Sequence, residues 1–324
     1  MTIPKPDLDP SRPRRLVLAA STGGHLAQLV RLAPGLGARE DSLWITHPGP
    51  QSESLLAGRN VMYVPYVGPR DASGVLRAFQ AIRSRMRAER FDAAVSTGAA
   101  LALAALPAAR SERVPTLHIE SVSRVDGPSL SGRVLATTGL AEVRTQHPSW
   151  SGGRWGVHPP VLSTFRSVTR EVDDERPLNL FVTLGTHERF RFDSLVDRLL
   201  SLGVVGPDSV WQLGCTPAQP GMPGRVHAQM KAAEFERAAR EADVVVTHSG
   251  VGTIMGLLEM GIFPVAVVRR KARGEHVDDH QAQIARLITE LEVGAGVEVD
   301  ELDAAVLSEA ASREVRPIEK QEVA

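Results

Sequence analysis

The chain has 324 residues, 43% hydrophobic and 23% charged, which predicts two domains of ordinary size and excludes a disordered protein. Its 37 basic and 38 acidic residues leave a net charge of -1, so no overall charge attracts nucleic acid or anionic lipid. The only cysteine, Cys215, excludes an internal disulfide bond and a cysteine zinc cluster, as suits a reducing cytoplasm.

Residues 1–14 are polar and proline-rich, and we expect them to form a disordered lead-in. From residue 15 onward, short apolar runs alternate with helical patterns, as in parallel βαβ units. Strands are predicted in the first half at Arg15–Ala20, Leu43–Thr46, Val61–Pro65, Ala93–Ser96 and Thr116–Ile119. Helices are predicted at His25–Leu32, Ser73–Arg87, Ala99–Ala109 and Ser129–Thr138. The most apolar of these, Ala99–Ala109, is shorter than the roughly 18–20 residues that span a bilayer, so no transmembrane helix is expected.

The segment His147–Pro177 has no sustained hydrophobic period and is typical of an interdomain linker. After it, the second half again alternates strand-like and helical patterns. Strands are predicted at Asn179–Leu184, Val210–Leu213, Val244–Thr247 and Pro264–Val268. Helices are predicted at Phe192–Leu202, Met230–Glu241, Thr253–Met260 and Asp279–Leu291. The fold class is therefore α/β, with Rossmann-like domains at 15–165 and 166–300, a cleft between them and a helical tail at 301–324.

The first strand runs into a glycine-rich turn, Ser21–His25, that opens a helix. The glycines allow close approach of a ligand, and the helix start offers amides to a phosphate or sugar oxygen. The turn is not G-x-G-x-x-G, which argues against a dinucleotide. An imidazole at this position suits a general base, although a structural turn with an incidental histidine is the alternative.

A second turn of this kind, Thr247–Thr253, follows the third predicted strand of the second half. It lacks the lysine of a Walker loop, and its amides and hydroxyls suit a diphosphate. An ordinary helix cap is the alternative interpretation.

The segment Arg269–Gln281 combines four cations with carboxylates, imidazoles and an amide. The cations suit a diphosphate, while Asp279 and Gln281 suit sugar hydroxyls. One alternative is a metal site formed by Glu275, His276, Asp279 and His280, because residues four apart share a helix face. The other alternative is a solvated charged loop.

Six segments together resemble GT-B glycosyltransferases: Ser21–Leu29, Val95–Ala100, Ile119–Arg133, Phe181–Val196, Thr247–Ile254 and Arg269–Gln281. The first half resembles the acceptor-side subunit, and the second half the donor-side subunit, of the two-part N-acetylglucosaminyltransferase that acts on dolichyl diphosphate sugars. Bacterial exopolysaccharide transferase pairs share that arrangement. The order of the two halves is that of the single-chain lipid II glycosyltransferase, a family 28 enzyme.

The resemblance implies metal-independent, inverting transfer from a UDP-sugar, without a cofactor, to a polyprenyl-diphosphate-linked saccharide. His25 and Glu120 match the catalytic positions. The acceptor-side positions are Thr22, Gly23, Gly24, Thr97, Gly98 and Ser121. The donor-side positions are Thr186, His248, Ser249, Gly250, Gly252, Thr253, Glu259, Arg270, Glu275, His276, Asp279 and Gln281.

Two features depart from the family pattern. Where relatives carry a ribose-binding glutamate this chain has Gly256, and Glu259 lies about one helical turn later. The membrane anchor of many acceptor subunits is missing, so we expect a cytoplasmic protein with peripheral membrane contact, for which the helix with Leu76, Phe79 and four arginines is a candidate. An ordinary solvated amphipathic surface is the alternative interpretation of this helix, and the sequence favours it. The alternative functions are a sugar-nucleotide epimerase of the same architecture and a non-catalytic UDP-sugar-binding scaffold.

Overall fold

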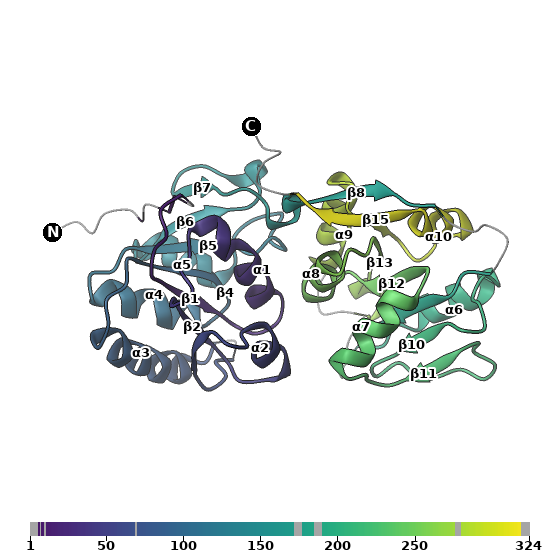
Figure 1. Ribbon diagram of the computed structural model, residues 1–324, viewed down its shortest axis with the longest axis horizontal. Coiled ribbons are helices and arrows are strands. Elements are labelled where there is room, and N and C mark those ends of the chain that lie inside the picture. Colours follow the sequence, from purple (N-terminus) through teal and green to yellow (C-terminus); the bar gives the residue numbers. More distant parts are fainter. Residues whose placement is uncertain are drawn as a thin grey trace. The chain divides into compact units, whose positions relative to one another are not determined.

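The computed structural model describes residues 6, 8–9, 11–68, 70–171, 177–184, 190–275 and 280–318 (Figure 1). The chain forms two compact units, Met1–Val161 and Leu162–Ala324. The division between the units falls four residues before the predicted boundary at residue 165. It lies within η3 (Val161–Thr164), a 3-10 turn.

The first unit is built on a seven-stranded parallel sheet in the order β3-β2-β1-β4-β5-β6-β7. Its strands are β1 (Leu16–Ala20), β2 (Leu43–Thr46), β3 (Asn60–Tyr63), β4 (Ala93–Gly98), β5 (Thr116–Ile119), β6 (Glu142–Thr145) and β7 (Trp155–Val157). Every residue of β1, β2, β4 and β5 is buried, as expected of parallel strands covered on both faces. The structure confirms the five strands predicted here and adds β6 and β7.

The helices of this unit are α1 (Gly24–Leu32), α2 (Pro50–Leu55), α3 (Ala72–Arg87), α4 (Ala102–Ser111) and α5 (Leu130–Thr138), with 3-10 turns η1 (Ala33–Leu36) and η2 (Pro148–Trp150). The sequence did not predict α2. Helix α4 begins three residues later than predicted, because β4 continues to Gly98, whose φ of +109° ends the strand.

Three of the four arginines of α3 are paired with carboxylates within the unit. Glu112 accepts hydrogen bonds from Arg83 and Arg87 at 2.7 and 3.0 Å, and Glu89 binds Arg85. These carboxylates neutralise part of the charge that was expected to face a membrane, although Leu76 remains exposed. No helix in the described ranges is both long and apolar enough to cross a bilayer.

The second unit contains a six-stranded parallel sheet in the order β11-β10-β9-β12-β13-β14. Its strands are β9 (Leu180–Thr183), β10 (Val210–Gln212), β11 (Arg225–His227), β12 (Val244–His248), β13 (Pro264–Val267) and β14 (Ala295–Val297). Its helices are α6 (Asp193–Leu202), α7 (Ala232–Glu241), α8 (Val251–Glu259), α9 (His280–Glu290) and α10 (Ala304–Ala311), and η4 (Lys271–Arg273) is a 3-10 turn. The four predicted strands and four predicted helices are all present.

A two-stranded antiparallel sheet joins β8 (Phe165–Thr169) to β15 (Arg313–Pro317), and the two strands lie side by side in Figure 1. The segment interpreted as a linker therefore contains two strands, β7 and β8, and the tail expected to be helical is partly helix and partly strand. Both strands are short and rich in polar residues, so they show no strong period, and their pairing depends on residues far apart in sequence.

Candidate active site

The glycine-rich turn of the first unit connects β1 to α1 and places His25 beside the end of β4. Nδ1–H of His25 donates to the carbonyl oxygen of Thr97 at 2.6 Å, and the Thr97 hydroxyl donates to the His25 carbonyl at 2.7 Å. Because a carbonyl only accepts, the ring carries its proton on Nδ1 and its lone pair on Nε2. Burial lowers the pKa of His25, outweighing the opposing effects of the Thr97 bond and of Glu120. A neutral imidazole with a basic Nε2 suits proton abstraction.

Gly98 lies against the His25 ring and has a φ of +109°, which favours glycine. A Cβ at this position would lie 3.0 Å from Cε1 and 3.1 Å from Nδ1 of His25. Gly98, which the sequence predicted to contact the acceptor, therefore leaves the space that the His25 ring occupies.

The Gly23 amide, predicted to face a ligand, is already bonded within the unit. Its N–H donates to Oε1 of Gln51 at 2.6 Å, and the Gln51 amide donates to the Gly23 carbonyl at 3.3 Å. Gln51 belongs to α2, the helix that the sequence did not predict, and no local pattern connects it to the turn. Gln51, a residue of another helix, thus stabilises the glycine-rich turn through both hydrogen bonds.

Glu120 follows β5 and is only 1% exposed. Its Oε2 accepts the amide and hydroxyl of Ser129, each at 2.9 Å, and its Oε1 accepts the amide of Ser121 at 3.2 Å. Burial alone raises the pKa of this carboxyl, but His118 and the Ser129 donors outweigh that effect and lower the pKa to about 2. Ser129 is the N-cap of α5, so the ionised carboxylate fixes the start of that helix.

The predicted acceptor-side residues lie at the carboxyl ends of neighbouring strands. Thr22, Gly23 and Gly24 follow β1, Thr97 and Gly98 end β4, and Ser121 comes shortly after β5. Since β1, β4 and β5 are adjacent in the sheet, the fold brings these residues to one edge, where ligands of such sheets bind.

In the second unit, the turn after β12 opens α8. The Thr247 hydroxyl donates to the Thr183 carbonyl at 3.1 Å, and the Ser249 hydroxyl donates to the Val267 carbonyl at 3.4 Å. A Cβ on Gly250 would lie 2.4 Å from Nε2 of His248, so a larger residue there would require the His248 ring to move. These contacts tie the turn to the adjacent strands β9 and β13.

Gly252 and Thr253 lie in the first turn of α8, whereas Glu259 is its last residue and is exposed. At about 1.5 Å of rise per residue, Glu259 lies roughly 10 Å along the axis from Gly252. The structure therefore does not bring Glu259 to the turn. A Cβ on Gly256 would meet nothing within 4 Å, so the position where relatives carry the glutamate is open.

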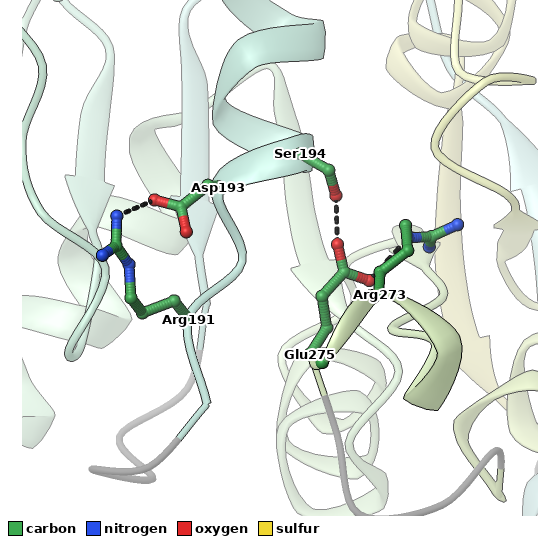
Figure 2. Close-up of a pocket in the computed structure, with 6 residues that line it drawn as sticks. Arg191, Asp193, Ser194, Arg273 and Glu275 are labelled. Carbon is green, nitrogen blue, oxygen red and sulfur yellow. Dashed lines mark hydrogen bonds and ion pairs between the residues drawn. The ribbon is translucent and has the colours of Figure 1, made fainter.

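Two arginines of the segment after β13 are paired with carboxylates. Arg270 binds Glu298 through Nε at 3.1 Å and through NH2 at 2.5 Å. Arg273 donates from Nε to Glu275 Oε2 at 2.8 Å, and Ser194 binds the other oxygen of Glu275. Figure 2 shows the Ser194–Glu275 contact and the Arg191–Asp193 pair. These four residues line a pocket of about 480 Å³. Glu275 thus joins the segment to the start of α6.

Arg269 is only 3% exposed and also acts within the unit. Its guanidinium donates to the Leu184 carbonyl at the end of β9 and lies 5.1 Å from the ring centre of Phe192, just before α6. Burial lowers its pKa to about 10. The sequence predicted cations for a diphosphate here, whereas in the structure Arg269, Arg270 and Arg273 hold neighbouring elements together.

The glycosyltransferase family 28 C-terminal domain matches residues 220–323, which include the α8 turn and the segment after β13. Over these residues the second unit is similar to the C-terminal domain of family 28 glycosyltransferases. A Synechococcus UDP-N-acetylglucosamine–N-acetylmuramyl-(pentapeptide) pyrophosphoryl-undecaprenol N-acetylglucosamine transferase is 31% identical over 118 residues, 34% of this chain. That match spans 33% of the relative's length.

Solved structures of the GT-B fold cover nearly all of this chain. MurG of Acinetobacter baumannii is 19% identical, with a TM-score of 0.54 over 91% of this chain and 89% of its own. A UDP-GlcNAc 2-epimerase from Methanocaldococcus jannaschii is 12% identical, with a TM-score of 0.55 over 91% of each chain. At these identities the likeness shows the fold alone, and it does not separate a transferase from an epimerase.

Three of the predicted donor-side residues lie outside the described residues, namely Thr186, His276 and Asp279. Gln281 is 8% exposed, and its Oε1 has no hydrogen-bond partner among the described residues. No group of three metal-binding side chains occurs in the described part of the chain, but His276 and Asp279, two of the four residues named for a metal site, lie outside it.

Proposed function

We propose that the protein is an inverting glycosyltransferase. It moves a sugar of the N-acetylglucosamine, galactose or glucuronic acid class from UDP to a polyprenyl-diphosphate-linked saccharide in cell-surface polysaccharide synthesis. The observation that carries the proposal is the His25–Thr97 hydrogen bond, which leaves a basic Nε2 at the carboxyl end of the first sheet. The family 28 match in the second unit supports a sugar-nucleotide donor.

In the proposed reaction, an acceptor hydroxyl attacks the anomeric carbon of the donor sugar. The new oxygen–carbon bond forms as the bond from that carbon to the UDP oxygen breaks, and UDP leaves with the bonding electrons. The hydroxyl proton passes to Nε2 of His25, whose imidazolium is held by the Thr97 carbonyl. The attack comes from the face opposite the leaving group, so the anomeric configuration inverts.

Glu120 takes a different role from His25 in this proposal. A carboxylate with three hydrogen-bond donors and a pKa of about 2 is a weak base at neutral pH. We assign it to positioning: it fixes the start of α5 and the loop that precedes it.

On the donor side, the amides at the start of α8 are assigned to the diphosphate, with Gly252 and Thr253 in the first turn. Aligned helix amides stabilise the charge that develops on the leaving diphosphate, so the proposal requires no divalent metal. Gln281, with its buried and unpartnered oxygen, is assigned to a hydroxyl of the donor sugar.

Such an acceptor resides in a membrane, so the proposal includes peripheral contact with the cytoplasmic face. Tyr66 and Leu76, at 66% and 56% exposure, offer apolar surface at the loop before α3 and at its start. Because Glu112 and Glu89 partly neutralise the arginines of α3, apolar contact contributes more to this interaction than charge.

The activity is tested by incubating the full chain with a panel of radiolabelled UDP-sugars and a bacterial membrane lipid extract. Label from one UDP-sugar entering the lipid phase supports the proposal. Interconversion of UDP-sugars without lipid identifies an epimerase, and UDP binding with neither reaction identifies a scaffold.

Calorimetry of UDP on the full chain tests the donor half separately. Gly252→Asp places a negative charge at the α8 amides and should abolish UDP binding, whereas His25→Ala should leave it unchanged. The opposite pattern would place the donor on the first unit.

A further inference from the structure

Helix α1 carries a second polar side chain one turn after His25. Gln28 is 0% exposed, and its amide donates to the Gly24 carbonyl at 3.0 Å and to the Ser121 hydroxyl at 3.1 Å. Its Oε1 accepts the amide of Val122 at 2.9 Å and the amide of Gln146 at 3.2 Å. Both donors and both acceptor sites of Gln28 are therefore used.

Gln146 extends this junction beyond the end of β6. It is also 0% exposed, and its amide donates to the Glu120 carbonyl at 2.9 Å, while its Oε1 accepts the amide of Val161 at 2.7 Å. The backbone of Glu120 and Val122 is thus bonded to side chains from two other elements. Two buried amides join the start of α1, the loop after β5 and the end of β6.

The geometry points to Gln28 and Gln146 as positioning residues for the acceptor site, an inference that rests on the proposed function. Neither amide titrates in the working pH range or reaches solvent, so both act through the backbone that they hold. Gln28 bonds to Gly24, in the turn that carries His25, and to the loop at Ser121 and Val122. It thereby fixes the spacing between the base and the loop on which the acceptor would rest.

The bond to Val122 gives a measurement that does not depend on activity. Without the acceptor oxygen of Gln28, the buried Val122 amide loses its partner and the loop should open more often. In Gln28→Leu, hydrogen exchange of the peptide that contains Val122 should therefore accelerate by roughly 10- to 100-fold. Gln28→Glu keeps an acceptor for Val122 but loses both donors, so its exchange should lie between that of Gln28→Leu and the wild type.

The kinetic test uses the full chain with its labelled UDP-sugar and increasing amounts of bacterial membrane lipid extract. We expect Gln28→Leu to raise the apparent KM for lipid by roughly tenfold or more and to leave the KM for UDP-sugar within twofold. Gln80→Ala, which removes an exposed amide from α3 without adding a large apolar side chain, is the control and should alter neither value. A merely destabilised fold lowers the active fraction, and hence kcat, without this split between substrates.

Unchanged exchange at Val122 in both Gln28 variants overturns the inference, and so do KM values that rise together for the two substrates. If Gln28→Leu does not fold, Gln28→Glu and the exchange measurement decide the outcome. If the wild-type chain transfers no sugar, the proposed function is contradicted. Accelerated exchange in Gln28→Leu would then still show that the loop depends on Gln28.

Discussion

Replacing Gly98 by alanine changes the room around the imidazole without removing any functional group. The substitution acts in two ways, because Gly98 has a φ of +109° and a Cβ there would lie 3.0 Å from Cε1 of His25. Either the backbone stays strained or the His25 ring moves away from the Thr97 carbonyl that it now meets at 2.6 Å.

The structure sets the magnitude of both effects. A non-glycine residue held at this φ costs about 1–3 kcal/mol, so the free energy of unfolding should fall by that amount. A ring displaced from Thr97 loses the bond that directs Nε2, and general-base catalysis contributes roughly 10²- to 10⁴-fold to a rate. We therefore expect turnover to fall at least tenfold, with complete removal of His25 as the upper bound.

The assay compares transfer rates, UDP affinity and thermal unfolding for Gly98→Ala and a matched control. Gly35→Ala lies in η1, has an ordinary φ and would meet nothing within 4 Å, so it should change neither rate nor stability appreciably. UDP affinity should be unchanged in both variants because the donor is assigned to the second unit. A Gly98→Ala protein with turnover within twofold of the wild type would refute the link between this glycine and the base.

Three further predictions concern pH and metal ions. Because burial lowers the pKa of His25, the acid limb of kcat/KM should lie below pH 6.5, and a limb above that value contradicts a buried base. Glu120 has a pKa of about 2 instead of 4.5, so its ionisation stabilises the fold by about 3 kcal/mol above pH 4.5, and this contribution disappears as pH falls toward 2. The stability deficit of Glu120→Gln, followed by urea unfolding, should shrink over that interval, whereas a constant deficit shows that the carboxylate does not titrate as described. EDTA should leave the transfer rate largely intact, and inactivation that added metal reverses would revive the metal site.

The sequence predicted the strands and the glycine-rich turns well because their signals are local. The strands Leu43–Thr46 and Thr116–Ile119 have the predicted bounds, since continuous apolar runs of this length mark buried parallel strands. Both glycine-rich turns follow such strands, so the order of elements alone placed them at the carboxyl ends of the sheets.

The contacts that define the site depend on residues far apart in sequence. Gln51 meets the first turn across 28 positions, and Gln146 meets Gln28 across 118. Glu298 accepts a hydrogen bond from Arg270, 28 positions away in the sequence. The arginines after β13, which the sequence suggests are available to a ligand, are therefore largely paired in the fold. Periodicity and motif spacing contain no information about such partners.

The central claim is that His25 is the base for sugar transfer and that Glu120 holds the loop. It is tested most directly by the transfer rate of label from saturating UDP-sugar to lipid in His25→Ala and Glu120→Gln. The account predicts that His25→Ala loses roughly 10²- to 10⁴-fold in rate and binds UDP normally, while Glu120→Gln retains most turnover per folded molecule. Near-wild-type turnover in His25→Ala, together with an inactive but folded Glu120→Gln, would contradict it.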